Sequence, residues 1–245
     1  MKRTLILVYG VVSYLIFLFT FIYAIGFIGN ILVPKGIDSE PQVDFWEALL
    51  TDLFLLTLFA VQHSVMARPV FKRWWTQFIP IAAERSTYTL LSSLALIVLF
   101  VFWQPLGGMV WQIENPVGIA LMWTGFVFGW LLVLVSTFLI NHFDLFGLRQ
   151  VWLYFRGRVY TSLSFVTPGP YRIIRHPLYL GWFFAFWCIP AMTVTHLVFA
   201  IATTVYILTA IQWEERDLIT ALGEDYQAYR KVVPMIVPFT NRAKK

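Results

Sequence analysis

The chain has 245 residues, of which 59% are hydrophobic and 13% charged, and its formal net charge is +5. Its mean hydropathy of +0.72 lies far above the average of soluble domains and excludes an ordinary soluble enzyme. The single cysteine, Cys188, excludes a disulfide framework and a Cys-x-x-Cys metal site. The composition therefore predicts an integral membrane protein.

Long apolar segments dominate the chain, and crossing a bilayer takes about 20 such residues. Four segments are long enough for one crossing each: 4–29, 45–66, 86–104 and 117–140. A fifth, 177–213, is too long for one. The polar stretch Thr193-Val-Thr-His196 after Pro190 predicts its division into two helices of about 18 residues each. We expect an all-α, polytopic membrane helix bundle of about six spans, or five if the last hairpin is re-entrant.

Basic residues gather on one side of these predicted spans. Of the 18 Lys and Arg residues, Lys35 alone falls in a connection on the opposite side. Because loops rich in Lys and Arg stay in the cytosol, both termini are predicted to be cytosolic. The net positive charge then indicates contact with membrane lipids, and we expect no nucleic-acid partner. The sequence shows no internal repeat, so we expect a single domain over 1–245.

A motif near the C-terminus follows the fourth predicted span and reads Tyr171-Arg-Ile-Ile-Arg-His-Pro-Leu-Tyr-Leu-Gly181. Pro177 suits the first position of a helix, where its missing N–H costs nothing. The free N–H groups of that first turn, reinforced by Arg175 and Arg172, would then form an anion site. Gly181, one turn further on, leaves room for a ligand or for a neighbouring helix.

The paired acids Glu214-Glu215 end the last apolar stretch and are predicted to return to the same membrane surface. If the helix stops there, both carboxylates meet the negative end of its dipole, and such a breach of a local rule often marks function. If the helix continues towards Leu222, that cost disappears. The simpler alternative is that Arg175 pairs with one of the two glutamates as an interfacial anchor.

Arg-His-Pro-x-Tyr-x-Gly followed by a glutamate pair resembles the signature of the isoprenylcysteine carboxyl methyltransferase and phospholipid methyltransferase superfamily of small membrane enzymes. The resemblance implies that S-adenosylmethionine, as methyl donor, binds in about 167–240 at the cytosolic membrane surface. Its carboxylate would lie at the helix start, and the glutamates would take its ribose hydroxyls or offset its positive charges. The implied cofactor residues are Tyr171, Arg172, Arg175, His176, Pro177, Tyr179, Leu180, Gly181, Glu214, Glu215, Tyr226 and Tyr229.

Flanking segments narrow the resemblance to the bacterial methanethiol S-methyltransferases. They are Glu84–Tyr88, Asn141–Gln150, Tyr154–Tyr160 and Thr167–Tyr171. The resemblance implies methylation of methanethiol, a small-molecule thiol, to dimethyl sulfide. It also implies the bacterial inner membrane as the location, and it indicates no obligate protein partner.

Thiol methylation needs a thiolate, whereas alkyl thiols are mostly protonated at neutral pH. His142 is the candidate base and Asp144 its orienting partner, with Arg85 placed to pair with Asp144. Alternatively, His142 is an interfacial histidine bonded to backbone, and the positive sulfonium alone favours the thiolate. His142, His63 and His176 lack paired metal-ligand spacing, so we expect no metal.

Two other functions remain open. A methyltransferase for a lipid or prenylcysteine acceptor would share the cofactor motif and differ in the acceptor pocket. A non-enzymatic membrane protein like the NnrU group would share the Gln62-His-Ser sequence, although retention of both motifs argues against it. Asp52, inside the second span, suits a substrate portal or a hydrogen bond between helices.

Overall fold

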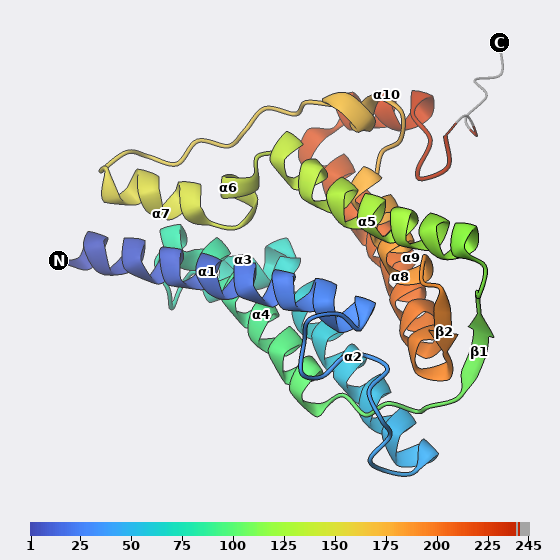
Figure 1. Ribbon diagram of the computed structural model, residues 1–245. Coiled ribbons are helices and arrows are strands. Elements are labelled where there is room, and N and C mark those ends of the chain that lie inside the picture. Colours follow the sequence, from blue (N-terminus) through green and yellow to red (C-terminus); the bar gives the residue numbers. More distant parts are fainter. Residues whose placement is uncertain (239, 241–245) are drawn as a thin grey trace. The chain divides into compact units, whose positions relative to one another are not determined.

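The computed structural model describes residues 1–238 and 240, and helices dominate it (Figure 1). Its long helices are α1 (Lys2–Gly29), α2 (Phe45–Ala67), α4 (Glu84–Phe102), α5 (Pro116–Leu139) and α9 (Val194–Leu222). The short helices are α3 (Pro69–Trp75), α6 (His142–Leu145), α7 (Leu148–Phe155), α8 (Pro177–Trp187), α10 (Glu224–Val232) and the 3-10 turns η1 (Ile81–Ala83) and η2 (Gly169–Arg172). The predicted fold class, an all-α polytopic membrane bundle, is confirmed.

Within the described residues, five helices are long and apolar enough to cross a membrane, so the protein is an integral membrane protein. The four single-crossing segments begin and end within a few residues of their predicted limits. The predicted division of 177–213 into two helices is present, but the prediction that both have about 18 residues was wrong. Helix α8 has 11 residues and rises about 16 Å, half the thickness of a bilayer core. Helix α9 has 29 residues.

The polar stretch after Pro190 explains this asymmetry. Helix α8 ends at Trp187, and the chain then forms strand β2 (Ala191–Thr193), which pairs with β1 (Met109–Gln112). The hydroxyl of Thr193 accepts a hydrogen bond from the N–H of His196 at 3.0 Å. Thr193 therefore caps the start of α9, as Thr commonly does. The polar stretch therefore separates two helices, as predicted, and it also begins the second of them.

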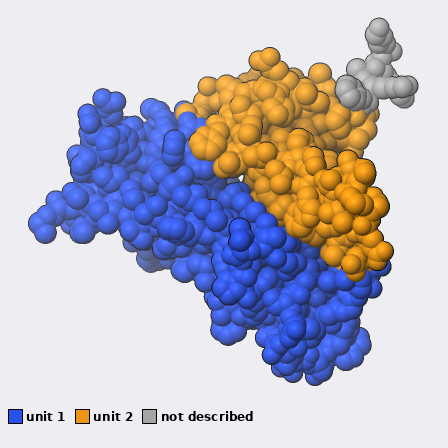
Figure 2. Space-filling model, in the orientation of Figure 1, with its two compact units in different colours: residues 1–110, 141–162, 193–198 blue, residues 111–140, 163–192, 199–245 orange. Residues whose placement is uncertain are grey.

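The described chain forms two compact units (Figure 2). Unit 1 contains residues 1–110, 141–162 and 193–198, and unit 2 contains 111–140, 163–192 and 199–245. A single domain over the whole chain stays a prediction.

In unit 1, α1 packs against α4 and α7, and α2 packs against α4. Polar side chains join these apolar helices, as when the Tyr9 hydroxyl donates to Thr87 Oγ1 at 2.9 Å. Asp52 is fully buried in α2, and its Oδ1 accepts from the N–H of Gln104, just past α4, at 2.8 Å. A hydrogen bond between elements, the second of the two explanations for Asp52, is therefore present.

In unit 2, α5 and α8 approach each other through glycines. A Cβ on Gly181 would lie 2.8 Å from the carbonyl oxygen of Gly129 and 2.9 Å from the backbone nitrogen of Val133. Small residues permit such close backbone packing between membrane helices. Of the two roles predicted for Gly181, the structure shows room for a neighbouring helix. This contact fixes the position of the first turn of α8 against α5.

Candidate functional site

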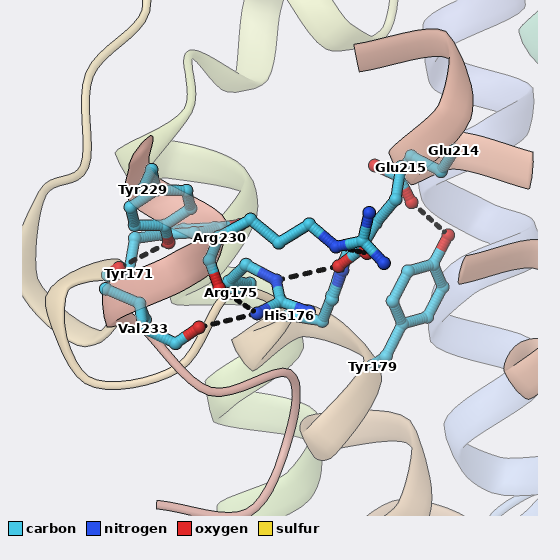
Figure 3. A network of polar contacts seen from close by, with 9 residues as sticks. All are labelled: Tyr171, Arg175, His176, Tyr179, Glu214, Glu215, Tyr229, Arg230 and Val233. Atoms are coloured by element: carbon cyan, nitrogen blue, oxygen red, sulfur yellow. Dashed lines mark hydrogen bonds and ion pairs between the residues drawn. The ribbon is translucent and has the colours of Figure 1, made fainter. Parts of the chain in front are cut away.

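Glu215 lies at the centre of a charged network in unit 2 (Figure 3). Its Oε1 lies 2.7 Å from Arg175 Nε and 3.0 Å from His176 Nε2, and its Oε2 lies 3.0 Å from Arg230 Nε. The side chains of Arg175, His176 and Glu215 are 7%, 5% and 4% exposed. Three partners thus compensate for the cost of burying one carboxylate.

The segment that follows α10 holds the same residues through its carbonyl groups. Arg175 Nη1 donates to the carbonyl oxygen of Val233 (Figure 3). The backbone N–H groups of Arg175 and His176 donate to the carbonyl oxygens of Pro234 and Met235, at 2.9 and 3.1 Å respectively. The chain around residue 234 is therefore part of the support for the Arg-His-Pro motif.

These contacts decide two expectations made from the sequence. Arg175 does pair with a glutamate, namely Glu215, while its role as an anion ligand stays a prediction. Of the two alternatives for the helix that carries the acids, the structure shows the second, because α9 continues to Leu222 and neither acid meets its end. The cost of burying Glu215 is offset by its cationic neighbours and does not involve the helix dipole.

Glu214 has a different environment from its neighbour. Its Oε2 accepts a hydrogen bond from the Tyr179 hydroxyl at 2.8 Å (Figure 3). Among the described residues it forms no ion pair. Tyr179 belongs to the first turn of α8, where Pro177 takes the predicted first position. The site therefore presents an unpaired carboxylate on α9 and a hydroxyl on α8.

Aromatic side chains pack beside this network. Tyr226 is 2% exposed, and its ring centroid lies 6.0 Å from that of Phe165 and 5.8 Å from that of Tyr229. The Tyr229 hydroxyl donates to the carbonyl oxygen of Tyr171 (Figure 3). Burial raises the pKa of Tyr229 to about 12 and also raises the pKa values of Tyr226 and Tyr171. All three phenols are therefore neutral at physiological pH.

Unit 2 contains all of the expected cofactor residues, and most of them lie around this network. Gly181 packs against α5 instead. Arg172 donates to the carbonyl oxygen of Thr167 at 3.3 Å. Sequence reasoning missed Arg230, although it directly follows the singled-out Tyr229. It also missed Val233, which contributes a backbone carbonyl that no residue type reveals.

The candidate base, His142, lies in unit 1 and begins α6. It is 4% exposed, and its Nε2 lies 2.8 Å from the Tyr14 hydroxyl, while its ring packs 4.8 Å from that of Phe146. Burial lowers the pKa of His142, so the ring is neutral and can accept a proton at pH 7. One of its hydrogen bonds is therefore to the side chain of Tyr14, and the alternative of a bond to backbone stays a prediction.

Asp144 forms its ion pair with Arg149 Nη1 at 2.7 Å, and it accepts a hydrogen bond from the Tyr160 hydroxyl at 3.2 Å. The expected partner was Arg85, so that pairing was wrong. Gly147 adopts a φ of +90° between α6 and α7. This turn carries Arg149 back towards Asp144, which the sequence spacing did not reveal.

Comparison with known proteins gives full-length relatives. A methanethiol S-methyltransferase of Crocosphaera subtropica is 57% identical over 242 residues, covering 99% of this chain and 95% of that protein. One from Mycobacterium tuberculosis is 51% identical, covering 99% of both chains, and methanethiol S-methyltransferase 2 of Bradyrhizobium diazoefficiens is 53% identical, covering 96% and 91%. No family model and no solved structure matches the chain. The chain belongs to the methanethiol S-methyltransferase family.

Proposed function

We propose that the protein transfers a methyl group from S-adenosylmethionine to methanethiol, giving dimethyl sulfide and S-adenosylhomocysteine. The observation that carries this proposal is 57% identity, over nearly the whole chain, to a protein named for that substrate. The enzyme would work in a bacterial inner membrane, with both termini and the donor site in the cytosol.

The side chains of unit 2 suit the methyl donor. The Glu214 carboxylate has no ion-pair partner among the described residues, so it is available to ribose hydroxyls or to the donor's positive charges. The N–H groups of the first turn of α8 suit the donor's carboxylate. Tyr229, which is partly exposed, offers aromatic surface for the adenine, and the buried Tyr226 packs against it. Arg175, His176 and Glu215 would hold α8, α9 and the C-terminal segment in place around it.

The reaction is a displacement at the methyl carbon. Methanethiol loses its proton, and the thiolate sulfur forms a bond to the methyl carbon while the bond from that carbon to the sulfonium sulfur breaks. The leaving sulfur keeps the electron pair and becomes a neutral thioether. His142 would accept the thiol proton, because its lowered pKa keeps it neutral at pH 7. Asp144, paired with Arg149, would position α6 and hence His142.

The test of the reaction supplies S-adenosylmethionine with a labelled methyl group and methanethiol to membranes that contain the protein. Labelled dimethyl sulfide should appear in the gas phase, and membranes without the protein should give none. If the label enters a lipid or a prenylcysteine and no dimethyl sulfide forms, the acceptor is a lipid and the thiol proposal is wrong.

The donor site can be tested separately by ligand stabilisation. S-adenosylhomocysteine should raise the melting temperature of detergent-purified protein, as linkage requires. Glu214→Gln and His176→Ala should reduce this rise strongly. His196→Gln is the control, since His196 lies in unit 1 beside Asp38, 3.5 Å away. An equal reduction in all three variants would contradict the assignment of the donor site to unit 2.

A further inference from the structure

Arg85, in the first turn of α4, carries a charge that the described residues leave uncompensated. Its Nε is buried and has no hydrogen-bond acceptor among them. Its side chain also forms no ion pair in that part of the chain. Leaving a buried charged donor without a partner is costly, because the group has given up water without replacing it. An acceptor that is not part of unit 1 would remove this cost.

The nearby acid is already neutralised by another residue. Asp144 is paired with Arg149 and accepts from Tyr160, so it does not balance Arg85. Burial raises the pKa of Tyr160, and Arg85 opposes that rise, which places the phenol within the field of the guanidinium. Glu84 precedes Arg85 in the same turn and forms no ion pair with it among the described residues.

Contacts of the neighbouring residue Ser86 fix the backbone beside Arg85. Gly147 packs directly on the first turn of α4, since a Cβ there would lie 2.6 Å from the nitrogen of Ser86. The Ser86 hydroxyl in turn donates to the carbonyl oxygen of Gly147 at 3.5 Å. The start of α4, which carries Arg85, is therefore held against the α6–α7 turn.

Gln150, in helix α7 of the same unit, has a buried acceptor atom without a partner among the described residues. Gln150 Nε2 donates to the carbonyl oxygen of Asp144 at 3.0 Å, which fixes the amide. Its Oε1 is buried and has no donor among the described residues. Unit 1 thus holds an unused charged donor and an unused neutral acceptor near the α6–α7 turn. A small thiol has both matching forms, a weak S–H donor and a thiolate acceptor.

We propose that Arg85 binds the acceptor substrate as its thiolate. This proposal rests on the proposed function, and it names the residue that stabilises the thiolate form of methanethiol. The positive guanidinium lowers the pKa of the bound thiol, so methanethiol gives up its proton to His142 and the thiolate sulfur accepts the N–H of Arg85. Arg85 is then a catalytic residue with its own role, independent of Asp144.

The test uses the full-length, detergent-purified protein and the variants Arg85→Gln and Arg85→Lys. Arg158→Gln is the matched control, since Arg158 is an exposed arginine of the same unit. Arg85→Gln should raise KM for methanethiol roughly ten-fold or more at pH 7, as loss of a charge-assisted hydrogen bond does. The rising limb of its kcat against pH should move to higher pH. The KM of Arg85→Lys for methanethiol should lie between those of the wild type and Arg85→Gln. In both variants KM for S-adenosylmethionine should stay within about two-fold of the wild-type value.

Thiocyanate serves as a probe of the anion site without turnover. It should compete with methanethiol in the wild-type enzyme and lose that effect in Arg85→Gln. An unchanged KM for methanethiol with an unchanged pH limb in Arg85→Gln would overturn the inference. Equal increases in both KM values with a lower melting temperature than Arg158→Gln would also overturn it, because that pattern indicates a structural role. If the wild-type enzyme forms no dimethyl sulfide, the proposed function itself fails.

Discussion

Two arginines at helix starts have opposite environments in this protein. Arg175, just before α8, has the Glu215 carboxylate and the Val233 carbonyl as acceptors. The Nε of Arg85, in the first turn of α4, is buried without an acceptor among the described residues. A charge that is fully partnered stabilises the fold, whereas one left without a partner is free to bind a ligand. Both residues are arginines at the start of a helix, so neither residue type nor position distinguishes a structural role from a binding role. The hydrogen-bond acceptors around each side chain make that distinction.

The largest expected effect comes from Glu215→Gln. This change leaves the buried Arg175 and the adjacent Arg230 without their counter-charge, and breaking a buried ion pair costs about 3–5 kcal/mol. Glu214→Gln is the matched control, because it weakens one hydrogen bond from Tyr179 and should cost only about 1 kcal/mol. Denaturant unfolding in detergent measures both. Equal losses would mean that Glu215 is no more a structural centre than Glu214.

The next effect concerns catalysis in unit 1. His142→Ala should lower kcat about 100-fold near pH 7, the lower end of what a general base contributes. The loss should shrink at alkaline pH, where free thiolate is already supplied. In the wild-type enzyme the base form is lost as pH falls through the His142 pKa, which burial places below 6.5. If the kcat profile of His142→Ala keeps the wild-type shape, the positive charges alone select the thiolate.

The smallest effect is expected for Tyr229→Phe, which removes one hydrogen bond to the Tyr171 carbonyl oxygen. Loss of a neutral hydrogen bond should lower the free energy of unfolding by about 1 kcal/mol at pH 8. The Tyr229 pKa is raised to about 12, so its contribution is complete below pH 10 and is lost as pH rises towards 12. The variant should lack that alkaline decline. A variant with wild-type stability at both pH values would show that the C-terminal segment is held without this bond.

Much of the helical fold could be predicted because bilayer thickness sets the length of an apolar segment. Pro177 and Gly181 were also informative, since each residue type suits few backbone positions. The partner of Asp144 could not be predicted, because Arg85 and Arg149 are equally charged and the turn at Gly147 decides between them. The carbonyl of Val233 was beyond sequence reasoning, since every residue has such a group.

The unbroken course of α9 has a consequence for where the reactants meet. From Val194 to Glu214 the helix rises about 30 Å, which equals the thickness of the hydrocarbon layer. When Val194 lies at one boundary of that layer, the glutamate pair lies at the other, and the last two turns to Leu222 extend into the head groups. In the proposed reaction the donor is a charged, water-soluble molecule, while methanethiol and dimethyl sulfide are small and apolar. With the donor bound at the glutamate pair, as proposed, α9 would set the reaction at a phase boundary, where the product could leave by partitioning into the bilayer.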